Sequence, residues 1–272
     1  MSNDDTNAAG TTLDSPHPHL RLSRRGPVLT VTLDHRARRN SQTPSMWVAL
    51  ARLARTVPDD VRIVILAGAG PSFSAGLDRG MLAPGGMPGE QDILAPAAAG
   101  ELEALTDLIA GLQEGFTAWA DCHAIVVAAV QGYAVGAGFQ LALAADLRVV
   151  AEDVQFVMGE TKLGMVPDLG GTAPLVSIMG YARALEVIAT GRAVGAREAM
   201  ETGLANLVVP ADQLAGAVQD LADAILAAPD PTIRALKTVL RAAISNSVAE
   251  QVVVERTAQA PLLAGIAKAL GR

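Results

Sequence analysis

The chain has 272 residues, 50% of them hydrophobic and 18% charged, which is enough for one large domain or a domain with a small appendage. Its formal net charge of -7 argues against a nucleic-acid-binding surface. The single cysteine, Cys122, excludes a disulfide framework and favours a reducing, cytoplasmic location, and we interpret it as a small core residue rather than a nucleophile.

The first residues of the chain are polar and acidic, with no apolar segment typical of a secretory signal. They predict a disordered tail over residues 1–19. His17 and His19 lie in this predicted tail without another ligand nearby, so we expect no metal site there.

Strands and helices are expected to alternate over the first two-thirds of the chain, and helices alone to follow. In chain order the expected elements are a strand at 28–34, a helix at 44–57, a strand at 61–68, a glycine-rich loop at 68–80, a mobile loop at 81–100, a helix at 101–120, a strand at 124–130, a helix at 138–146, a strand at 147–152, an extended piece at 154–158, helices within 172–191, and further helices from 196 onward with a turn at 228–231. This order predicts an α/β core with a helical C-terminal part.

The chain runs from Ala124 to Ala145 without a charged side chain, which is long enough to cross a bilayer. The run is interrupted by three glycines and two glutamines, however, and it begins with β-branched residues. We therefore interpret it as two buried elements joined by a glycine turn, and expect no membrane span.

Two glycine-rich turns, FSAGLD (73–78) and GYAVGAGFQL (132–141), each follow an apolar strand. Glycine lets a ligand approach main-chain N–H groups, and a helix N-terminus adds a positive dipole end. Two such turns facing each other can place two donors on one oxygen, as in an oxyanion hole. The glycine spacing does not fit a dinucleotide fingerprint, and no phosphate-binding loop or zinc motif occurs.

The order FSAGLD, then VQGYAVGAGFQLALAADLRVVAE, then FVMGETKLGMVPDLGGT resembles the crotonase (enoyl-CoA hydratase/isomerase) superfamily, as do RRNSQT (38–43) and AQAPLL (258–263). The resemblance covers about residues 20–265. It implies a spiral of ββα units over 20–195, a helical trimerisation region over 196–272, and a homotrimer or dimer of trimers. It also implies an acyl-CoA thioester as the substrate, with no other cofactor.

The same resemblance implies roles for individual residues. The backbone N–H groups of Leu77 and Ala137 would form the oxyanion hole. Substrate and CoA contacts would come from Arg39, Ser41, Ala75 and Gln140. The basic cluster at 36–39 would face the CoA phosphates, while we interpret Asp78 as a loop or helix-cap residue.

The catalytic carboxylates implied by the resemblance are Glu160 and Asp168, and the sequence leaves open which of them is the base. The family's hydratases use two glutamates, and the first would fall at Gln140, whose amide has no proton to exchange. One carboxylate is enough for a 1,3-proton shift, so the residues favour a Δ3-Δ2 enoyl-CoA isomerase over a hydratase. A hydratase, a non-catalytic acyl-CoA binder and a serine peptidase using Ser74 are the alternatives.

Overall fold

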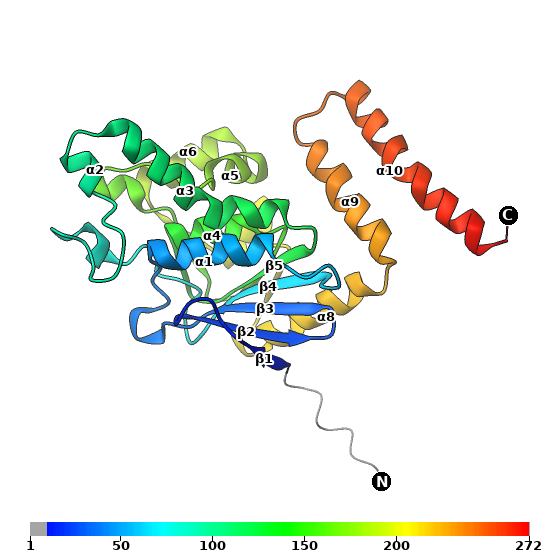
Figure 1. The fold of residues 1–272 in the computed structure, drawn as a ribbon, viewed down its shortest axis with the longest axis horizontal. Coiled ribbons are helices and arrows are strands. Elements are labelled where there is room, and N and C mark those ends of the chain that lie inside the picture. The colour runs from blue at the N-terminus through cyan, green and yellow to red at the C-terminus, as the bar shows by residue number, and fades with distance from the viewer. Residues whose placement is uncertain (1–9, 272) are drawn as a thin grey trace, which may run out of the picture. The chain divides into compact units, whose positions relative to one another are not determined.

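The main sheet has seven strands in the spatial order β1-β2-β3-β4-β5-β7-β10, of which Figure 1 labels β1 to β5. The computed structural model describes residues 10–271. The first three strands are antiparallel, and the strands from β3 to β10 run parallel. Their bounds are Thr11–Leu13, Leu20–Arg25, Val28–Leu33, Ile63–Gly68, Ile125–Val130, Leu147–Ala151 and Leu207–Val209. The parallel strands β3, β4, β5 and β7 are buried along most of their length, as is typical of strands covered on both faces of a sheet.

A smaller sheet and a set of helices complete the first unit. The small sheet has the order β6-β8-β9, with bounds Tyr133–Val135, Gln155–Val157 and Ala193–Gly195. The helices are α1 (Pro44–Arg55), α2 (Ala95–Ala98), α3 (Leu102–Asp121), α4 (Ala137–Ala144), α5 (Thr172–Met179), α6 (Tyr181–Thr190) and α7 (Ala196–Thr202). Helices α1 and α3 pack against each other, with Trp47 of α1 edge-on to Phe116 of α3. The predicted α/β core is therefore confirmed.

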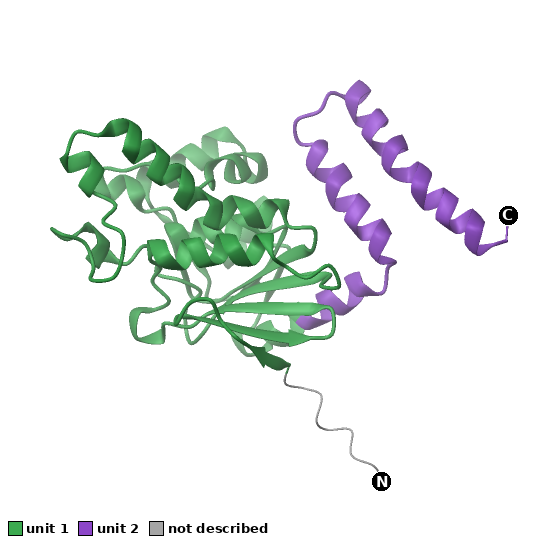
Figure 2. Cartoon of the chain, viewed as in Figure 1, with its two compact units in different colours: residues 1–218 green, residues 219–272 purple. Residues whose placement is uncertain are grey.

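The chain divides into two compact units, one ending at Val218 and the other beginning at Gln219 (Figure 2). The second unit contains the end of α8 (Leu214–Leu226), then α9 (Asp230–Ala242) and α10 (Val248–Ala269). The predicted boundary between 195 and 196 differs from the division between these two units. Strand β10 lies beyond that boundary and pairs in parallel with β7, which extends the main sheet past residue 195.

The predicted tail over residues 1–19 is wrong for its second half. Strand β1 pairs with β2, and the imidazole of His17 is buried, with its Nε2 3.1 Å from the hydroxyl of Ser45. The ring of His19 stacks on that of His35 at 3.8 Å. Polar residues conceal this order because an edge strand needs few apolar side chains. Residues 1–9 lie outside the described part of the chain.

The uncharged run from Ala124 to Ala145 folds as β5, β6 and α4, in agreement with the prediction of buried elements joined by a glycine turn. Within residues 10–271, no helix is both long enough and apolar enough to cross a bilayer.

The segment 81–100, predicted as a mobile loop, contains α2 and is held to the start of α1 by Glu90. The carboxylate of Glu90 accepts hydrogen bonds from the amide and hydroxyl of Ser45.

Candidate active site

The two glycine-rich turns lie side by side, joined by their own main chains. Ser74 forms a parallel bridge with Ala134: its N–H donates to Tyr133, and its carbonyl accepts from Val135. Leu77 forms a second parallel bridge with Gln42, in which Gln42 N–H donates to the Gly76 carbonyl and Asp78 N–H to the Gln42 carbonyl. The turn at 74–78 is therefore fixed on both edges.

These bonds leave two backbone donors free. In the bridge with Gln42, the bonds fall on the residues either side of Leu77, so the Leu77 N–H points away from it. Ala137 is the first residue of α4, where an N–H has no partner within the helix. Across residues 10–271, neither N–H has a hydrogen-bond partner. Both donors are therefore available to a ligand.

Glycine at position 76 is required for the two turns to approach. Gly76 has a φ of +80°, and a side-chain carbon built on it would collide with the carbonyl oxygen of Val135. The same carbon would lie 3.3 Å from the Ala137 nitrogen. The residue before Leu77 is thus in near contact with the second free donor. This arrangement can hold one oxygen between two N–H groups, beside the positive end of α4.

Glu160 lies next to these donors, in the short 3-10 helix η3 (Glu160–Leu163). Its Oε1 accepts a hydrogen bond of 2.8 Å from the Gln140 amide, whereas its Oε2 is buried and without a partner in the described chain. A side-chain carbon built on Gly136, the residue that caps α4, would lie 3.3 Å from Oε1. The carboxylate is therefore adjacent to the N-terminus of α4, with one oxygen held and the other available.

Burial raises the pKa of Glu160 above its ordinary value. Hydrogen bonds from its backbone and from Gln140 favour the ionised form, and the nearby charge of Asp168 adds to the increase. The net result is a carboxyl group that exchanges protons closer to neutral pH than a surface glutamate does. Such a group is suited to take a proton and return it.

Gln140 is buried and uses its whole side chain within the protein. While its amide nitrogen donates to Glu160, its oxygen accepts from the N–H groups of Leu169 and Gly171, at 2.9 and 3.2 Å. The residue predicted as a substrate contact therefore joins the Glu160 carboxylate to the loop that carries Asp168. Those three segments are distant in sequence, so only the fold reveals their connection.

Asp168 is exposed on that loop, and its backbone carbonyl accepts a bond of 2.6 Å from Gln113 of α3. Although the residue as a whole is exposed, neighbouring protein removes part of the water around its carboxyl group, which raises the pKa of that group. The structure thus places both predicted carboxylates in one region. Glu160 is the more buried of the two and the one adjacent to the free N–H groups.

The predicted CoA-side residues lie on the loop before α1. Arg39 is exposed, with a φ of +50°, and its carbonyl accepts from the N–H of Ala75. The hydroxyl of Ser41 is buried and donates to Asp78 at 2.8 Å. The side chain of Ser41 is therefore committed to the protein, so a ligand contact at this position has to come from its main chain.

Asp78 is confirmed as a capping residue. It accepts from the N–H of Gly80 at the start of η2 (Arg79–Leu82), and Arg38 lies 3.5 Å away. Burial alone would raise the pKa of Asp78, but bonds from Gly80 and Ser41 and the charge of Arg38 hold it below its ordinary value. Asp78 remains ionised and structural.

Three buried polar residues behind the turns, Asn40, Gln42 and Ser74, form a hydrogen-bonded network that the sequence does not reveal. The Asn40 amide donates to the carbonyls of Ala69, Ser72 and Phe73. Gln42 donates to the Ser74 hydroxyl at 2.9 Å and accepts from the Trp47 indole at 2.7 Å. The only sequence signal is a run of polar residues directly before an apolar helix, which is equally typical of a surface loop.

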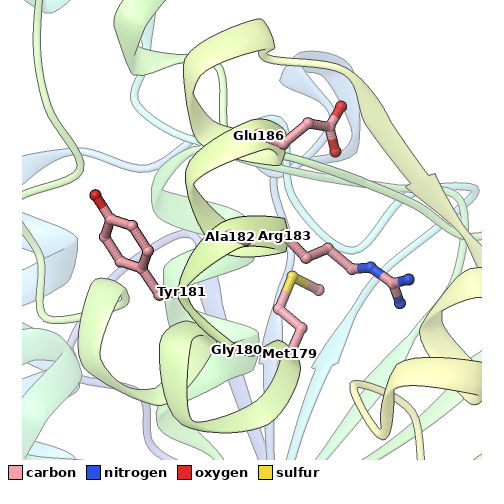
Figure 3. A pocket seen from close by; sticks show the side chains of 6 residues that line it. All are labelled: Met179, Gly180, Tyr181, Ala182, Arg183 and Glu186. Atoms are coloured by element: carbon pink, nitrogen blue, oxygen red, sulfur yellow. The ribbon is translucent and has the colours of Figure 1, made fainter.

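Two hollows on the surface lie apart from these residues. One, at the start of α6, is lined by Met179, Gly180, Tyr181, Ala182, Arg183 and Glu186 (Figure 3). The other lies between α1 and α3 and includes Arg55, Glu114 and His123. Neither hollow contains a residue of the two turns, Glu160 or Asp168, so both lie outside the candidate site.

Comparison with known proteins agrees with this geometry. A profile described as enoyl-CoA hydratase/isomerase matches residues 23–264. The carnitinyl-CoA dehydratase of Salmonella enteritidis PT4 (strain P125109) is 37% identical over 234 residues, covering 85% of this chain and 83% of that protein.

Solved structures give the same assignment. A candidate enoyl-CoA hydratase from Thermobifida fusca YX, in complex with acetoacetyl-CoA, has a TM-score of 0.86 and 43% identity, covering 91% of this chain and 95% of that one. A candidate enoyl-CoA hydratase from Streptomyces coelicolor A3(2) has a TM-score of 0.83 and 27% identity, covering 96% and 93%. The fold, the two turns and the family profile agree, and the chain belongs to the enoyl-CoA hydratase/isomerase family, the crotonase superfamily of acyl-CoA enzymes.

Proposed function

We propose that the protein is an acyl-CoA isomerase that moves a double bond from the 3,4 to the 2,3 position of an enoyl-CoA. The observation that carries this proposal is the half-buried carboxylate of Glu160, with one oxygen held by an amide and the other buried and unpartnered in the described chain, beside the N-terminus of α4. At position 140, where a hydratase of this family would have a second carboxylate, the protein has an amide, whose nitrogen donates to Glu160 and which has no acidic proton to exchange.

In the proposed reaction the thioester oxygen accepts hydrogen bonds from the N–H groups of Leu77 and Ala137. The Oε2 atom of ionised Glu160 takes a proton from Cα, and the electrons of that C–H bond delocalise over the dienolate to the thioester oxygen. The carboxylic acid then returns the proton to Cγ, leaving the double bond conjugated with the thioester. Each oxyanion donor of this kind is worth about 3–4 kcal/mol in the transition state.

The CoA part of the substrate is assigned to the loop before α1, with Arg39 at its exposed tip and Ala75 beside it. The Thermobifida fusca relative was solved both with acetoacetyl-CoA and with CoA, which supports CoA as the ligand. The choice of this loop is supported by Arg36, Arg38 and Arg39, whose positive charges would attract the phosphates of CoA. The proposal requires the CoA thioester as substrate and no further cofactor.

The test is turnover of a 3-enoyl-CoA, followed by the absorbance of the conjugated product. Glu160→Gln removes the proton carrier but keeps the shape of the side chain, so activity should fall by about 10³-fold or more. Asp168→Asn should reduce activity by less, through its effect on the Glu160 pKa. Wild-type activity in the folded Glu160→Gln variant would reject Glu160 as the base.

A second candidate is removal of water from a 3-hydroxyacyl-CoA, the reverse of hydration. Two observations favour it: the 37% identity to a carnitinyl-CoA dehydratase, and the presence of Asp168 close enough to raise the pKa of Glu160. In this reaction Glu160 takes the Cα proton, and Asp168 protonates the departing hydroxyl. A panel of 3-enoyl-CoA, 2-enoyl-CoA and 3-hydroxyacyl-CoA substrates separates the reactions, and tight binding without turnover would indicate an acyl-CoA binder.

We also propose that the protein assembles as a trimer or dimer of trimers through its second unit. Helix α10 has no fully buried residue within the described chain, and it exposes apolar side chains along its length. These include Val248, Val252, Val253, Leu263 and Ile266. Such a surface is typical of a subunit contact. Sedimentation of the intact chain measures the state directly, and a monomer at micromolar concentration would reject the assembly.

A further inference from the structure

Ser74 lies directly behind the proposed oxyanion hole, and its hydroxyl uses its full hydrogen-bonding capacity. The Oγ atom accepts from the Gln42 amide at 2.9 Å and from the Gly76 N–H at 3.1 Å, and it donates to the Asn40 carbonyl at 2.7 Å. The residue is completely buried. One hydroxyl therefore joins Gly76 of the turn at 74–78 to Asn40 of the loop before α1.

The same side chain also contacts the second turn. A side-chain carbon built on Gly138, the second residue of α4, would lie 2.7 Å from the Ser74 Cβ and 3.0 Å from its Oγ. Glycine at 138 thus lets Ser74 pack against the first turn of the helix that begins at Ala137. Ser74 therefore contacts Gly76, which precedes the Leu77 donor, and Gly138, which follows the Ala137 donor.

Gln42 determines the direction of the Ser74 O–H bond. The indole N–H of Trp47 donates to the Gln42 oxygen at 2.7 Å, so the nitrogen of that amide must face Ser74. Because Oγ then receives a donor from Gln42 and another from Gly76, its own proton is directed to Asn40. The chain Trp47–Gln42–Ser74–Asn40 has a single consistent arrangement of protons, which holds the 74–78 turn in one conformation.

We propose that Ser74 is a positioning residue that aligns the Leu77 and Ala137 N–H groups on the thioester oxygen, with Gln42 fixing the orientation of its hydroxyl. This inference rests on the proposed oxyanion hole. Ser74 acts through Gly76 and Gly138 and does not touch the substrate. Its burial and its fully used hydroxyl also argue against a role as a peptidase nucleophile, because no donor or acceptor capacity is left for a base.

The test compares Ser74→Ala with Ser72→Ala, the same change at a buried serine of the same loop whose hydroxyl is outside this network. The probe is acetoacetyl-CoA, whose enolate has its own near-ultraviolet absorbance and whose oxygen needs the two donors but no turnover. Wild type and Ser72→Ala should bind it with the enolate enriched. Ser74→Ala should bind with about 10-fold less enolate at the same pH, because misplaced donors favour the charge less.

Kinetics supply the second measurement. Ser74→Ala should lower kcat for the 3-enoyl-CoA by about 10- to 100-fold, with KM changed less than about 3-fold, because misalignment affects the transition state most. Gln42→Met keeps the side-chain volume and should give a smaller loss in the same direction. A general packing defect would instead lower thermal stability without changing the enolate fraction of the bound probe.

The outcomes separate the two proposals. If wild type binds acetoacetyl-CoA without enolate enrichment, the oxyanion hole itself is rejected, and this inference with it. If wild type enriches the enolate and Ser74→Ala does so equally, the role of Ser74 is rejected while the proposed function stands. Should Ser74→Ala fail to fold, Ser74→Cys and Gln42→Met take its place, and wild-type enolate binding in both would overturn the inference.

Discussion

Replacing Gln140 with glutamate tests the assignment of Glu160 most directly. The Gln140 nitrogen is 2.8 Å from Glu160 Oε1, while the Gln140 oxygen is held by the Leu169 and Gly171 N–H groups. A glutamate would keep the held oxygen and place its second oxygen where the amide nitrogen now donates. Two carboxylates would then face each other across that distance, and at neutral pH they would have to share one proton.

The size of the effect follows from the distance. With about 4 Å between the two charge centres and an effective dielectric constant of about 20, two ionised carboxylates repel by about 4 kcal/mol. That energy corresponds to about 3 pKa units. The proposed base must be ionised to take the α proton, so the acidic limb of the pH profile for isomerisation should move upward by about 1–3 units. At neutral pH the rate should fall by about 10-fold or more.

The assay is the rate of conversion of a 3-enoyl-CoA as a function of pH, in Gln140→Glu and in wild type. Gln155→Glu, the same change on β8 without a bond to Glu160, serves as the matched control and should keep the wild-type profile. A paired carboxylate also provides a second acid, so addition of water to a 2-enoyl-CoA should increase in Gln140→Glu. If the variant is folded and its acidic limb is unmoved, Glu160 is not the base.

Three further predictions concern the elements that support the site. Gly76→Ala should lower the unfolding free energy by on the order of 2–4 kcal/mol and remove most of the activity, because the added side chain collides with the carbonyl of Val135. Gly100→Ala is the control: Gly100 also has a positive φ, of +76°, but lies in open space, so this variant measures the backbone strain alone. Equal losses of stability in the two variants would contradict the collision at Gly76. Arg148→Met should lower the free energy of unfolding in urea by about 2–5 kcal/mol, because the buried guanidinium donates hydrogen bonds to the carbonyls of Leu204 and Ala145. Burial lowers the pKa of Arg148 to about 10. A loss of less than about 1 kcal/mol would contradict this structural role for Arg148. Burial and the charges of His19 and His35, opposed by Glu90, lower the pKa of His17 below 6.5. Its contribution to stability is therefore complete above pH 6.5 and is lost as pH falls through its folded-state pKa. Between pH 8 and pH 5 wild type should lose more thermal stability than His17→Gln, and parallel losses in the two proteins would refute this.

The sequence predicts the core elements well because their apolar patterns are long and unambiguous. The strands at 28–33, 63–68 and 125–130 and the helices at 44–55 and 102–121 all lie where the periodicity places them. It fails for β1 and β10, since a strand of three residues at a sheet edge leaves almost no pattern, and for β2, whose three arginines mask its alternating leucines. For this reason the polar residues of β1 are indistinguishable in sequence from a disordered tail.

Within the candidate site, the sequence identifies positions but not partners. Gln140 stands out in an apolar helix, yet its bond to Glu160 joins residues twenty apart, and only the packing of η3 against α4 creates it. The sequence predicts a substrate contact for Ser41, whereas the fold directs its hydroxyl to Asp78. Polar side chains in a loop look alike in sequence whether they face a ligand or a buried neighbour, so such assignments need coordinates.

The lack of charge on α4 follows from its place in the site as well as from its burial. The polar interactions at this helix need no charged side chain on it: its first N–H groups face the proposed thioester site, its one polar side chain, Gln140, holds Glu160, and Arg148 from outside the helix donates to the carbonyl of Ala145 just past its C-terminus. With its carbonyl end neutralised by a buried cation, the helix needs no water there. Its positive end then acts in surroundings of low polarity, where its effect on a developing enolate is strongest. A negative charge in the first turns would oppose that effect, which is a second reason to expect Gln140→Glu to lose isomerase activity.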